Sequence, residues 1–425
     1  MEKSYKTLTP LTAKLCLGAA LMTSAAGLQA QTADPARVDR IEKENADLRK
    51  RLETLEMVAQ KEGLIASAAK GAMPVNAMSK MSLSGFVTAS YFHDTSNPPA
   101  LPGSPANSPR TSPGYLWNRT SDSFSLNKVK LTLASPAVEA SGEKWDAAYR
   151  TSLIFGQDVP IVNSSSKING FENIREAYVE LNVPIGTGLN VKAGELISLL
   201  NYESGDGGAA NDNFSQGYQW FYTGNGPAAG VQLGYTINDI FDVKVRVQNG
   251  MYAGPVDNND AKTVMAALGI KPSKTVWLSL IGFGGSENAG LSLKGASLLA
   301  GWQATEQLHF GTELDYFDFN GKGGKTSGNV YSIGGWASYD FTKKVGLALR
   351  AEYLSDSKGV DISGPLGFPA NSGNHITSIA LTLNYKPVPS VKIQPEVRYD
   401  HTTVKNGFGT KADRVILGAG VSYLF

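Results

Sequence analysis

Charged residues in the C-terminal four fifths of the chain tend to fall at every second position, with apolar residues between them. In 391–400 every even position is polar or charged, from Lys392 to Asp400, while the odd positions hold Val, Ile, Pro, Val and Tyr. A period of two puts these two kinds of side chain on opposite faces of a β-strand. Charges gathered on one wetted face attract, repel and hydrogen-bond ions and polar solutes, which is the chemistry of a pore lining.

The same alternation assigns nine basic and eight acidic residues to the polar face. Twelve of them are the candidate pore-lining residues: Lys128, Lys130, Arg150, Glu176, Glu180, Lys244, Arg246, Arg350, Glu352, Lys392, Glu396 and Arg398. Nearly equal numbers of the two signs predict weak discrimination between cations and anions. The alternative for any one of these residues is a solvated or salt-bridged wall charge that contacts no solute.

Catalytic and metal-binding patterns do not occur in the sequence. The four histidines are scattered, without a His-Glu-x-x-His pattern or a serine at a recognisable motif. The run 257–260, Asp-Asn-Asn-Asp, has oxygen ligands but not the spacing of a calcium loop. A formal net charge of +1 gives no sign of nucleic-acid binding. We therefore expect no enzyme, no cofactor and no metal.

Alternating segments recur between Ser82 and Phe425, joined in turn by tight and long connections. We predict strands at 83–92, 124–134, 144–155, 174–183, 189–196, 229–237, 241–249, 262–271, 275–284, 296–304, 308–319, 330–340, 345–354, 376–385, 391–400 and 414–425. Short turns at one end and long loops at the other are typical of outer-membrane barrels. The predicted fold class is all-β, a transmembrane antiparallel β-barrel of about 16 strands. We expect 285–295 to be one of the long loops, and Pro395 to mark a bulge.

The apolar face carries aromatic residues near the strand ends, as the interfacial girdles of a barrel require. The chain ends in the alternating run from Gly420 to Phe425. This ending resembles the C-terminal signal that outer-membrane barrels present to their assembly machinery. A two-sheet sandwich would also alternate, but its polar face would meet bulk water.

The connection from Ile197 to Ala228 combines carboxylates with aromatic residues and six glycines. Its candidate constriction residues are Glu203, Asp206, Asp212, Tyr218 and Trp220. Folded into the lumen, it would narrow the pore and place its carboxylates there. The alternative is an extracellular cap, and the sequence leaves both open.

The first 81 residues have a different composition. Residues 1–30 resemble a secretory signal peptide and contain the single cysteine, Cys16, so the mature chain would have no thiol. Residues 34–62 have apolar residues at heptad spacing, with Asn45 at a core position, and predict a short periplasmic coiled-coil helix. The alternative is a single solvated helix. Residues 63–81 are a predicted linker to the barrel domain, 82–425.

Three segments carry a family resemblance: 175–184, Arg-Glu-Ala-Tyr-Val-Glu-Leu-Asn-Val-Pro; 211–215, Asn-Asp-Asn-Phe-Ser; and Val247-Gln-Asn-Gly250 followed by Asp257-Asn-Asn-Asp-Ala-Lys262. On these residues the chain resembles the β-barrel porins of the OmpL-like type over roughly 82–425. Gln216 stands where the family usually has a basic residue. The resemblance implies a passive outer-membrane channel and names no substrate.

The sequence therefore predicts a porin in the outer membrane of a diderm bacterium, exported with a cleaved signal peptide. Its expected partners are outer-membrane lipid, the barrel assembly machinery and further copies of itself in a homotrimer. The alternative function is a structural anchor that links the barrel to the cell wall through the coiled coil. Single-channel conductance would separate these two functions.

Overall fold

A computed structural model describes residues 81–100, 108, 110–113, 118–163, 171–251, 256–257, 259–288, 290–362 and 373–425, together with six residues near the N-terminus. The chain divides into two compact units, Met1–Ser79 and Lys80–Phe425. The predicted signal peptide, the linker up to residue 80 and the heptad positions lie outside the described residues. The six N-terminal residues are helical and exposed, and none belongs to the apolar heptad stripe: Lys43, Ala46, Asp47, Lys50, Arg51 and Thr54.

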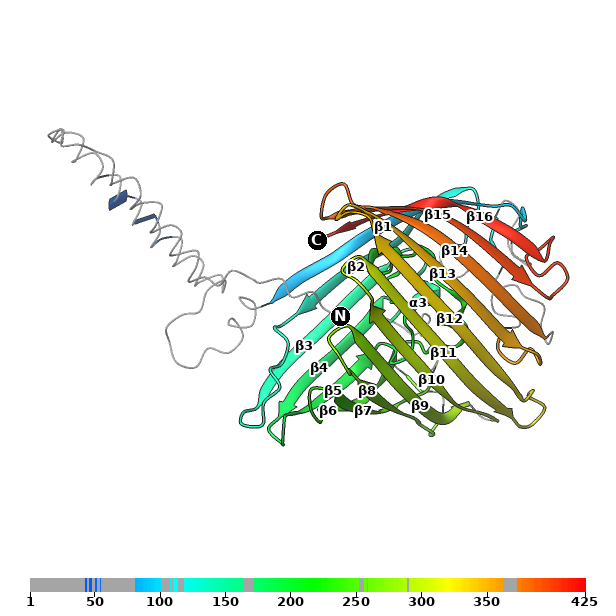
Figure 1. Cartoon of the computed structure of the whole chain (residues 1–425). Helices are drawn as coiled ribbons and strands as arrows, with labels where there is room; N and C mark the ends of the chain where they lie inside the picture. The colour runs from blue at the N-terminus through cyan, green and yellow to red at the C-terminus, as the bar shows by residue number, and fades with distance from the viewer. Residues whose placement is uncertain are drawn as a thin grey trace. The chain divides into compact units, whose positions relative to one another are not determined.

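Sixteen antiparallel strands form a closed barrel (Figure 1). They are β1 Ser82–Asp94, β2 Ser123–Ala134, β3 Asp146–Phe155, β4 Ile174–Val183, β5 Leu189–Leu196, β6 Ala228–Thr236, β7 Phe241–Gln248, β8 Thr263–Ile270, β9 Val276–Asn288, β10 Leu291–Gln303, β11 Leu308–Gly321, β12 Gly328–Asp340, β13 Val345–Asp356, β14 Asn374–Tyr385, β15 Val391–Thr402 and β16 Asp413–Leu424. Each strand pairs with its sequence neighbours, so the predicted all-β, sixteen-strand barrel is confirmed.

The barrel closes where the last strand meets the first. Phe86 is opposite Leu424, and the backbone amides of Gly85 and Phe425 each donate to the other residue's carbonyl, at 2.9 and 3.0 Å. In Figure 1 the blue β1 lies beside the red β16. The closed ladder satisfies backbone groups that an open sheet edge would leave unpaired, a necessity in lipid.

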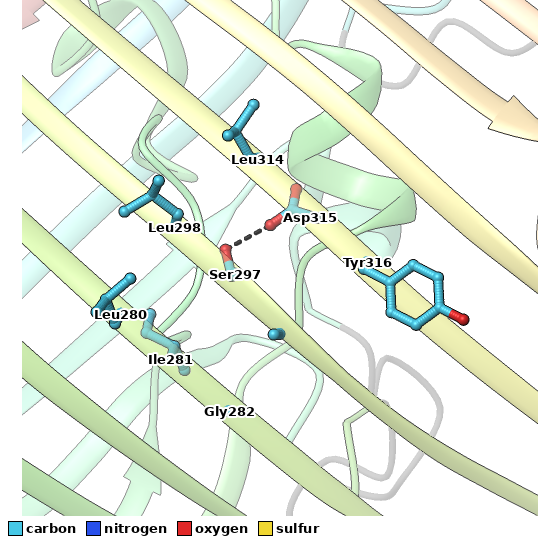
Figure 2. Close-up of a pocket in the computed structure, with 9 residues that line it drawn as sticks. Leu280, Ile281, Gly282, Ser297, Leu298, Leu314, Asp315 and Tyr316 are labelled. Atoms are coloured by element: carbon cyan, nitrogen blue, oxygen red, sulfur yellow. Dashed lines mark hydrogen bonds between the residues drawn. The ribbon is translucent and has the colours of Figure 1, made fainter.

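The alternation seen in the sequence separates two faces of the wall. Figure 2 shows Leu298, Leu314 and Tyr316 on the outer side, while Ser297 and Asp315 point inward and are joined by a hydrogen bond. Tyr316 is 47 % exposed, whereas Asp315 is buried. The apolar outer face is the one that a membrane barrel presents to lipid, and the inner face holds the charges.

Strand length divides the barrel into two arcs. β3 to β8 have eight to ten residues each and form the short-strand arc. The other ten strands, β9 to β16 with β1 and β2, have 12 to 14 residues and form the long-strand arc. Connections such as 184–188 and 304–307 lie at the turn end of the barrel, and the connection 197–227 lies at its loop end.

Two details of the predicted barrel are wrong. The expected long loop at 285–295 is strand, because β9 ends at Asn288 and β10 begins at Leu291. The glycines of this stretch are typical of a loop. On the outer face of the barrel, however, Lys294 pairs with Asp318 at 3.4 Å, so these strands extend past the apolar band. Pro395 causes no register shift, since it lies opposite Ala419 in an unbroken ladder with β16. Its missing amide removes one donor without displacing the strand.

Inside the loop end of the long-strand arc, apolar side chains from the wall pack against the loops. Phe283, Phe317 and Leu354 from the wall share a buried cluster with Tyr222 and Met251 from the loops. Three short helical segments occur in the described loops: α3 Val159–Val162, η2 Gly207–Ala209 and α4 Tyr218–Tyr222. No helix among the described residues combines the length and apolarity that a membrane crossing demands.

Candidate functional site

The connection between β5 and β6, residues 197–227, runs along the inner face of the long-strand arc. Its backbone amides are bound by carboxylates that project from the wall. Glu313 accepts from the amide of Tyr202 at 2.7 Å, and Glu396 accepts from that of Phe214 at 2.8 Å. Glu352 accepts the amides of the first two residues of α4 at 3.2 and 3.1 Å. We call residues 202–222 the inner loop.

Two buried arginines of the wall also bind the inner loop. Arg350 on β13 donates to Glu203 at 2.8 Å and to the carbonyl of Ser215. Arg398 on β15 donates to the carbonyl of Gln216 at 2.7 Å. Because the side chains of Arg350 and Glu203 are almost completely buried, losing one would leave the other charge uncompensated in a desolvated site. The loop is therefore fixed by charge as well as by hydrogen bonds.

A third arginine connects α4 to the end of the barrel seam. Arg414 on β16 donates to the hydroxyl of Tyr218 at 2.7 Å and to Asp400 at 2.9 Å. It also lies 3.3 Å from Asp94 on β1. Tyr218 in turn donates to Asp400 at 2.9 Å. The phenol of Tyr218 thus joins α4 to β15 and β16 through Asp400 and Arg414.

Aromatic residues of the inner loop pack on the wall. The ring of Tyr202 stacks on Trp336 with centroids 4.6 Å apart and on Trp277 at 6.1 Å. Burial raises the pKa of Tyr202 to about 12, and burial also raises the pKa of Tyr218. Trp220 packs against Val159 and Val162 of α3. The loop therefore has an apolar underside, which explains why an aromatic-rich segment does not extend into solvent.

Six of the twelve candidate lining residues contact the inner loop on the long-strand arc: Lys130, Arg350, Glu352, Lys392, Glu396 and Arg398. Lys130 bonds to Asp206 at 2.8 Å, which ties the loop to β2. Lys392 donates to the carbonyl of Asn211, also within the loop. Lys128 lies 3.2 Å from Asp158, in the loop before α3. The side chain of Asp212 is exposed, unlike the other candidate constriction residues Glu203, Tyr218 and Trp220.

The remaining candidate lining residues lie on the short-strand arc, away from this network. Arg150 pairs with Glu176 at 2.7 Å, and Glu180 lies 3.5 Å from Lys192. Arg246 donates to the carbonyl of Ile197, where the β5–β6 connection begins. Lys244 is 46 % exposed and 3.6 Å from Asp242. The sequence grouped these residues with those of the long-strand arc, but the barrel separates them.

Sequence reasoning missed several residues of the site. Arg175 is the extra residue of a bulge, because Ser152 pairs with Glu176 and Leu153 with Ile174, so strand alternation misplaces it. Its guanidinium donates to the carbonyl of Val162 at 2.8 Å. Arg414 has the same parity as the inward-facing Ile416, so alternation alone could have identified it. Gln219 of α4, which donates to Asp315 at 2.7 Å, carries no sequence signal.

A pocket of about 250 Å³ remains between the inner loop and the wall. Lys130 and Arg175 line it from the strands, and Glu203, Asp206 and Trp220 line it from the loop. The described residues contain no group of three or more His, Cys, Asp or Glu side chains arranged to bind a metal. The arrangement can exclude, admit and bind solutes by size and charge.

A family model described as "Putative beta-barrel porin-2, OmpL-like" matches residues 80–425, four fifths of the chain. The chain belongs to this porin family. The predicted resemblance is thereby confirmed for the whole barrel domain. No curated protein matches the sequence.

Solved structures share the fold at low sequence identity. The outer membrane channel DcaP of Acinetobacter baumannii superposes with a TM-score of 0.52 at 14 % identity, over 81 % of this chain and 97 % of that one. A loop-deletion mutant of OmpT, an outer membrane protein of Vibrio cholerae, gives 0.51 at 10 %, over 81 % and 99 %. An anion-selective porin from Comamonas acidovorans gives 0.50 at 10 %, over 81 % and 99 %. This porin's barrel is thus of the kind found in outer-membrane channels.

Proposed function

We propose that this porin forms a water-filled channel in a bacterial outer membrane, through which small polar solutes and ions diffuse. The observation that carries the proposal is a loop held inside a closed sixteen-strand barrel by Glu352, Glu396 and Arg350 of its wall. A barrel of this size leaves a lumen that wall side chains do not fill. A segment fixed across part of that lumen narrows the path and limits solute size.

The wetted path in this proposal follows the short-strand arc. There three inward cations, Arg150, Lys192 and Lys244, remain accessible, with side chains exposed by 35, 27 and 46 %. Arg246 on the same arc is buried. On the long-strand arc the corresponding charges, such as Arg350 and Glu352, are buried beneath the inner loop. In this proposal Arg150 and Lys244 face solutes on the short-strand arc, while Arg350, Glu352 and Glu396 bind the inner loop on the long-strand arc.

The exposed charges favour a modest preference for anions. Each accessible cation has a carboxylate partner that is less exposed: Glu176 at 4 %, Glu180 at 15 % and Asp242 at 20 %. Solutes would meet the ammonium and guanidinium groups before the carboxylates. The effect is limited because every one of these cations is paired, and paired charges in water interact weakly with a third ion.

Planar-bilayer recording of the purified protein tests the proposal. We expect stable single-channel steps and, in a tenfold salt gradient, a reversal potential displaced slightly toward the value for an anion-selective pore. A folded, heat-modifiable barrel that conducts no ions would rule out the diffusion channel.

The route to the membrane is also part of the proposal. We infer that residues 1–30 are removed on export, that the assembly machinery recognises the run ending at Phe425, and that the folded barrel contacts outer-membrane lipid and associates into a trimer. The pairing of Phe425 with Gly85 at the seam supports the importance of this last residue. The anchor function depends on the heptad segment 34–62, which gains no support from the described residues.

A further inference from the structure

A groove of about 440 Å³ lies on the outer face of the barrel wall, across β9, β10 and β11. Its floor includes Gly282 on β9 and Ala296 on β10, which lie opposite each other. Figure 2 shows the larger side chains that border this groove: Leu280, Leu298, Leu314 and Tyr316. The groove exists because two neighbouring strands carry small residues at the same level of the wall.

The small residues continue onto a third strand. Gly282 also lies opposite Ala266 on β8, so three adjacent strands carry at most a methyl group at this level. A Cβ atom added to Gly282 would have no atom of the described residues within 4 Å. Strands are spaced about 4.8 Å apart, and carbon atoms pack at about 4 Å from one another. The missing side chains therefore leave room for a hydrocarbon chain.

The groove begins at the level of the tyrosines near the loop end. Ala296 lies opposite Tyr316, and Tyr316 lies opposite Tyr331 on β12. These two tyrosines are 47 and 48 % exposed, as expected for rings that lie at the level of the lipid headgroups. The groove then extends toward the middle of the wall, where Leu298 lies opposite Leu280. At this depth the bilayer offers acyl chains, and an unfilled groove would lose their dispersion contacts.

Lysines lie on the outer surface just beyond the groove, toward the loop end. Lys294 is two residues before Ala296 on the same face of β10. Its side chain is 74 % exposed, whereas that of its partner Asp318 is 28 % exposed. Lys262, next to the first residue of β8, is 41 % exposed, and its partner Asp257 is 12 % exposed. In both pairs an approaching group meets the ammonium before the carboxylate, which favours an anionic headgroup.

We propose that this groove binds one acyl chain of lipid A, a phosphorylated and multiply acylated glycolipid, and that Lys294 and Lys262 bind a phosphate of the same molecule. Two residues of a strand tilted by about 40° advance about 5 Å along the membrane normal. Lys294 therefore lies at headgroup level when the chain enters the groove at Ala296. The long loops of an outer-membrane barrel face the cell exterior, so the loop end meets the leaflet that contains lipid A. The proposal concerns lipid binding and stands independently of conduction.

Two matched glycine variants test the groove. Gly282→Leu fills it with a side chain. Gly335→Leu adds the same side chain on β12, at a glycine two residues from the outward Ile333, where an added Cβ likewise has no described atom within 4 Å. Each purified protein is stripped of lipid in detergent, checked for heat modifiability and incubated with lipid A. Native mass spectrometry then counts the lipid molecules that each chain retains.

We expect the parent protein and Gly335→Leu to retain one lipid A per chain, and Gly282→Leu to retain it at least fivefold less often. Equal retention by all three folded proteins would overturn the proposal. The proposal would also be wrong if Gly282→Leu altered the oligomer and left lipid A retention unchanged, because another copy of the chain would then cover the groove.

A lysine variant tests the headgroup contact without changing the groove. Lys294→Gln is compared with Lys343→Gln, which alters an exposed lysine in the turn after β12, at the opposite end of the barrel. We expect Lys294→Gln alone to lower lipid A retention at least threefold and to abolish the preference for lipid A over its dephosphorylated form. Equal effects of the two variants would refute the phosphate contact. Displacement of lipid A by an equimolar amount of phosphatidylglycerol would refute the assignment to lipid A.

Discussion

The long-strand and short-strand arcs belong to one continuous sheet, yet each face of the sheet differs between them. Inside the long-strand arc, charges such as Arg350 and Glu352 are buried and bind the inner loop. Inside the short-strand arc, Arg150 and Lys244 remain accessible. Outside, the long-strand arc has tyrosines at its loop end, whereas β6 to β8 of the short-strand arc have Ala229, Val247 and Val264 there. The comparison teaches that one alternating pattern can build a loop-binding wall on one side and a wall with accessible charges on the other.

The largest effect is expected from releasing the inner loop. Glu352→Ala removes the acceptor of two α4 amides and a partner of Arg350 at 3.1 Å. Breaking a buried ion pair costs about 3–5 kcal/mol. Here this cost weakens the attachment of the loop and does not destabilise the barrel. We expect single-channel conductance to rise at least twofold, with heat modifiability retained. The control Glu180→Ala, on the opposite arc, should leave loop and conductance nearly unchanged; a rise of the same size there would refute the division into two arcs.

A smaller effect is expected from the accessible cations. Reversing two of them together, Arg150→Glu and Lys244→Glu, should move the reversal potential in a salt gradient toward cation preference, by on the order of 10 mV. The control Lys392→Gln removes a cation that is 6 % exposed and bonded to the inner loop. Selectivity should change little in this control. If Lys392→Gln shifted the potential more than the double variant, the solute path would follow the long-strand arc.

Alkaline pH should loosen the inner loop before it affects the barrel. In the attached loop the pKa of Tyr202 is raised by burial from 10.0 to about 12. The neutral phenol is therefore favoured in the attached state, and its stabilising contribution is complete below pH 10 and is lost as the pH rises from 10 to 12. We expect conductance to rise and the fluorescence of Trp336, which stacks on this ring, to change over that interval. In Tyr202→Phe we expect no transition between pH 10 and 12. If the variant showed the same transition as the parent protein, the transition would be due to other groups.

The smallest effect is expected at the edge of the loop. Lys130 and Asp206 form a pair whose side chains are 10 and 20 % exposed. A partly solvated pair contributes on the order of 1 kcal/mol. Asp206→Asn should therefore raise the frequency of brief openings in single-channel records while leaving the main conductance level unchanged. A change in the main level as large as that of Glu352→Ala would mean that the loop is held chiefly at β2.

Much of the wall could be predicted from the sequence because strand alternation has only two outcomes at each position. The inward Glu396 and Arg398 and the outward Tyr399 follow from period two alone. Prediction failed where that period or its meaning changed. Arg175 lies in a bulge, and the stretch 285–295 is strand whose outer residues Ser286, Ser292 and Lys294 are polar because it extends beyond the apolar band.

The partners of the inner loop could not be predicted, because they are far apart in the chain. Tyr202 and Glu313 are separated by 111 residues, and Phe214 and Glu396 by 182. No local pattern links such residues, and the loop's composition was equally compatible with a cap outside the barrel. Its place inside depends on backbone amides meeting carboxylates that only the closed barrel brings together.

The sequence by itself determined the alternating strands, the short turns at one end and the seam-closing residue Phe425, because side-chain direction in a strand and turn chemistry are local properties. The tertiary structure alone decided which wall charges bind the inner loop and which remain in contact with water. That division depends on where one connection crosses the lumen. It follows from long-range electrostatic and hydrogen-bond matching that exists only after all sixteen strands have closed into a barrel.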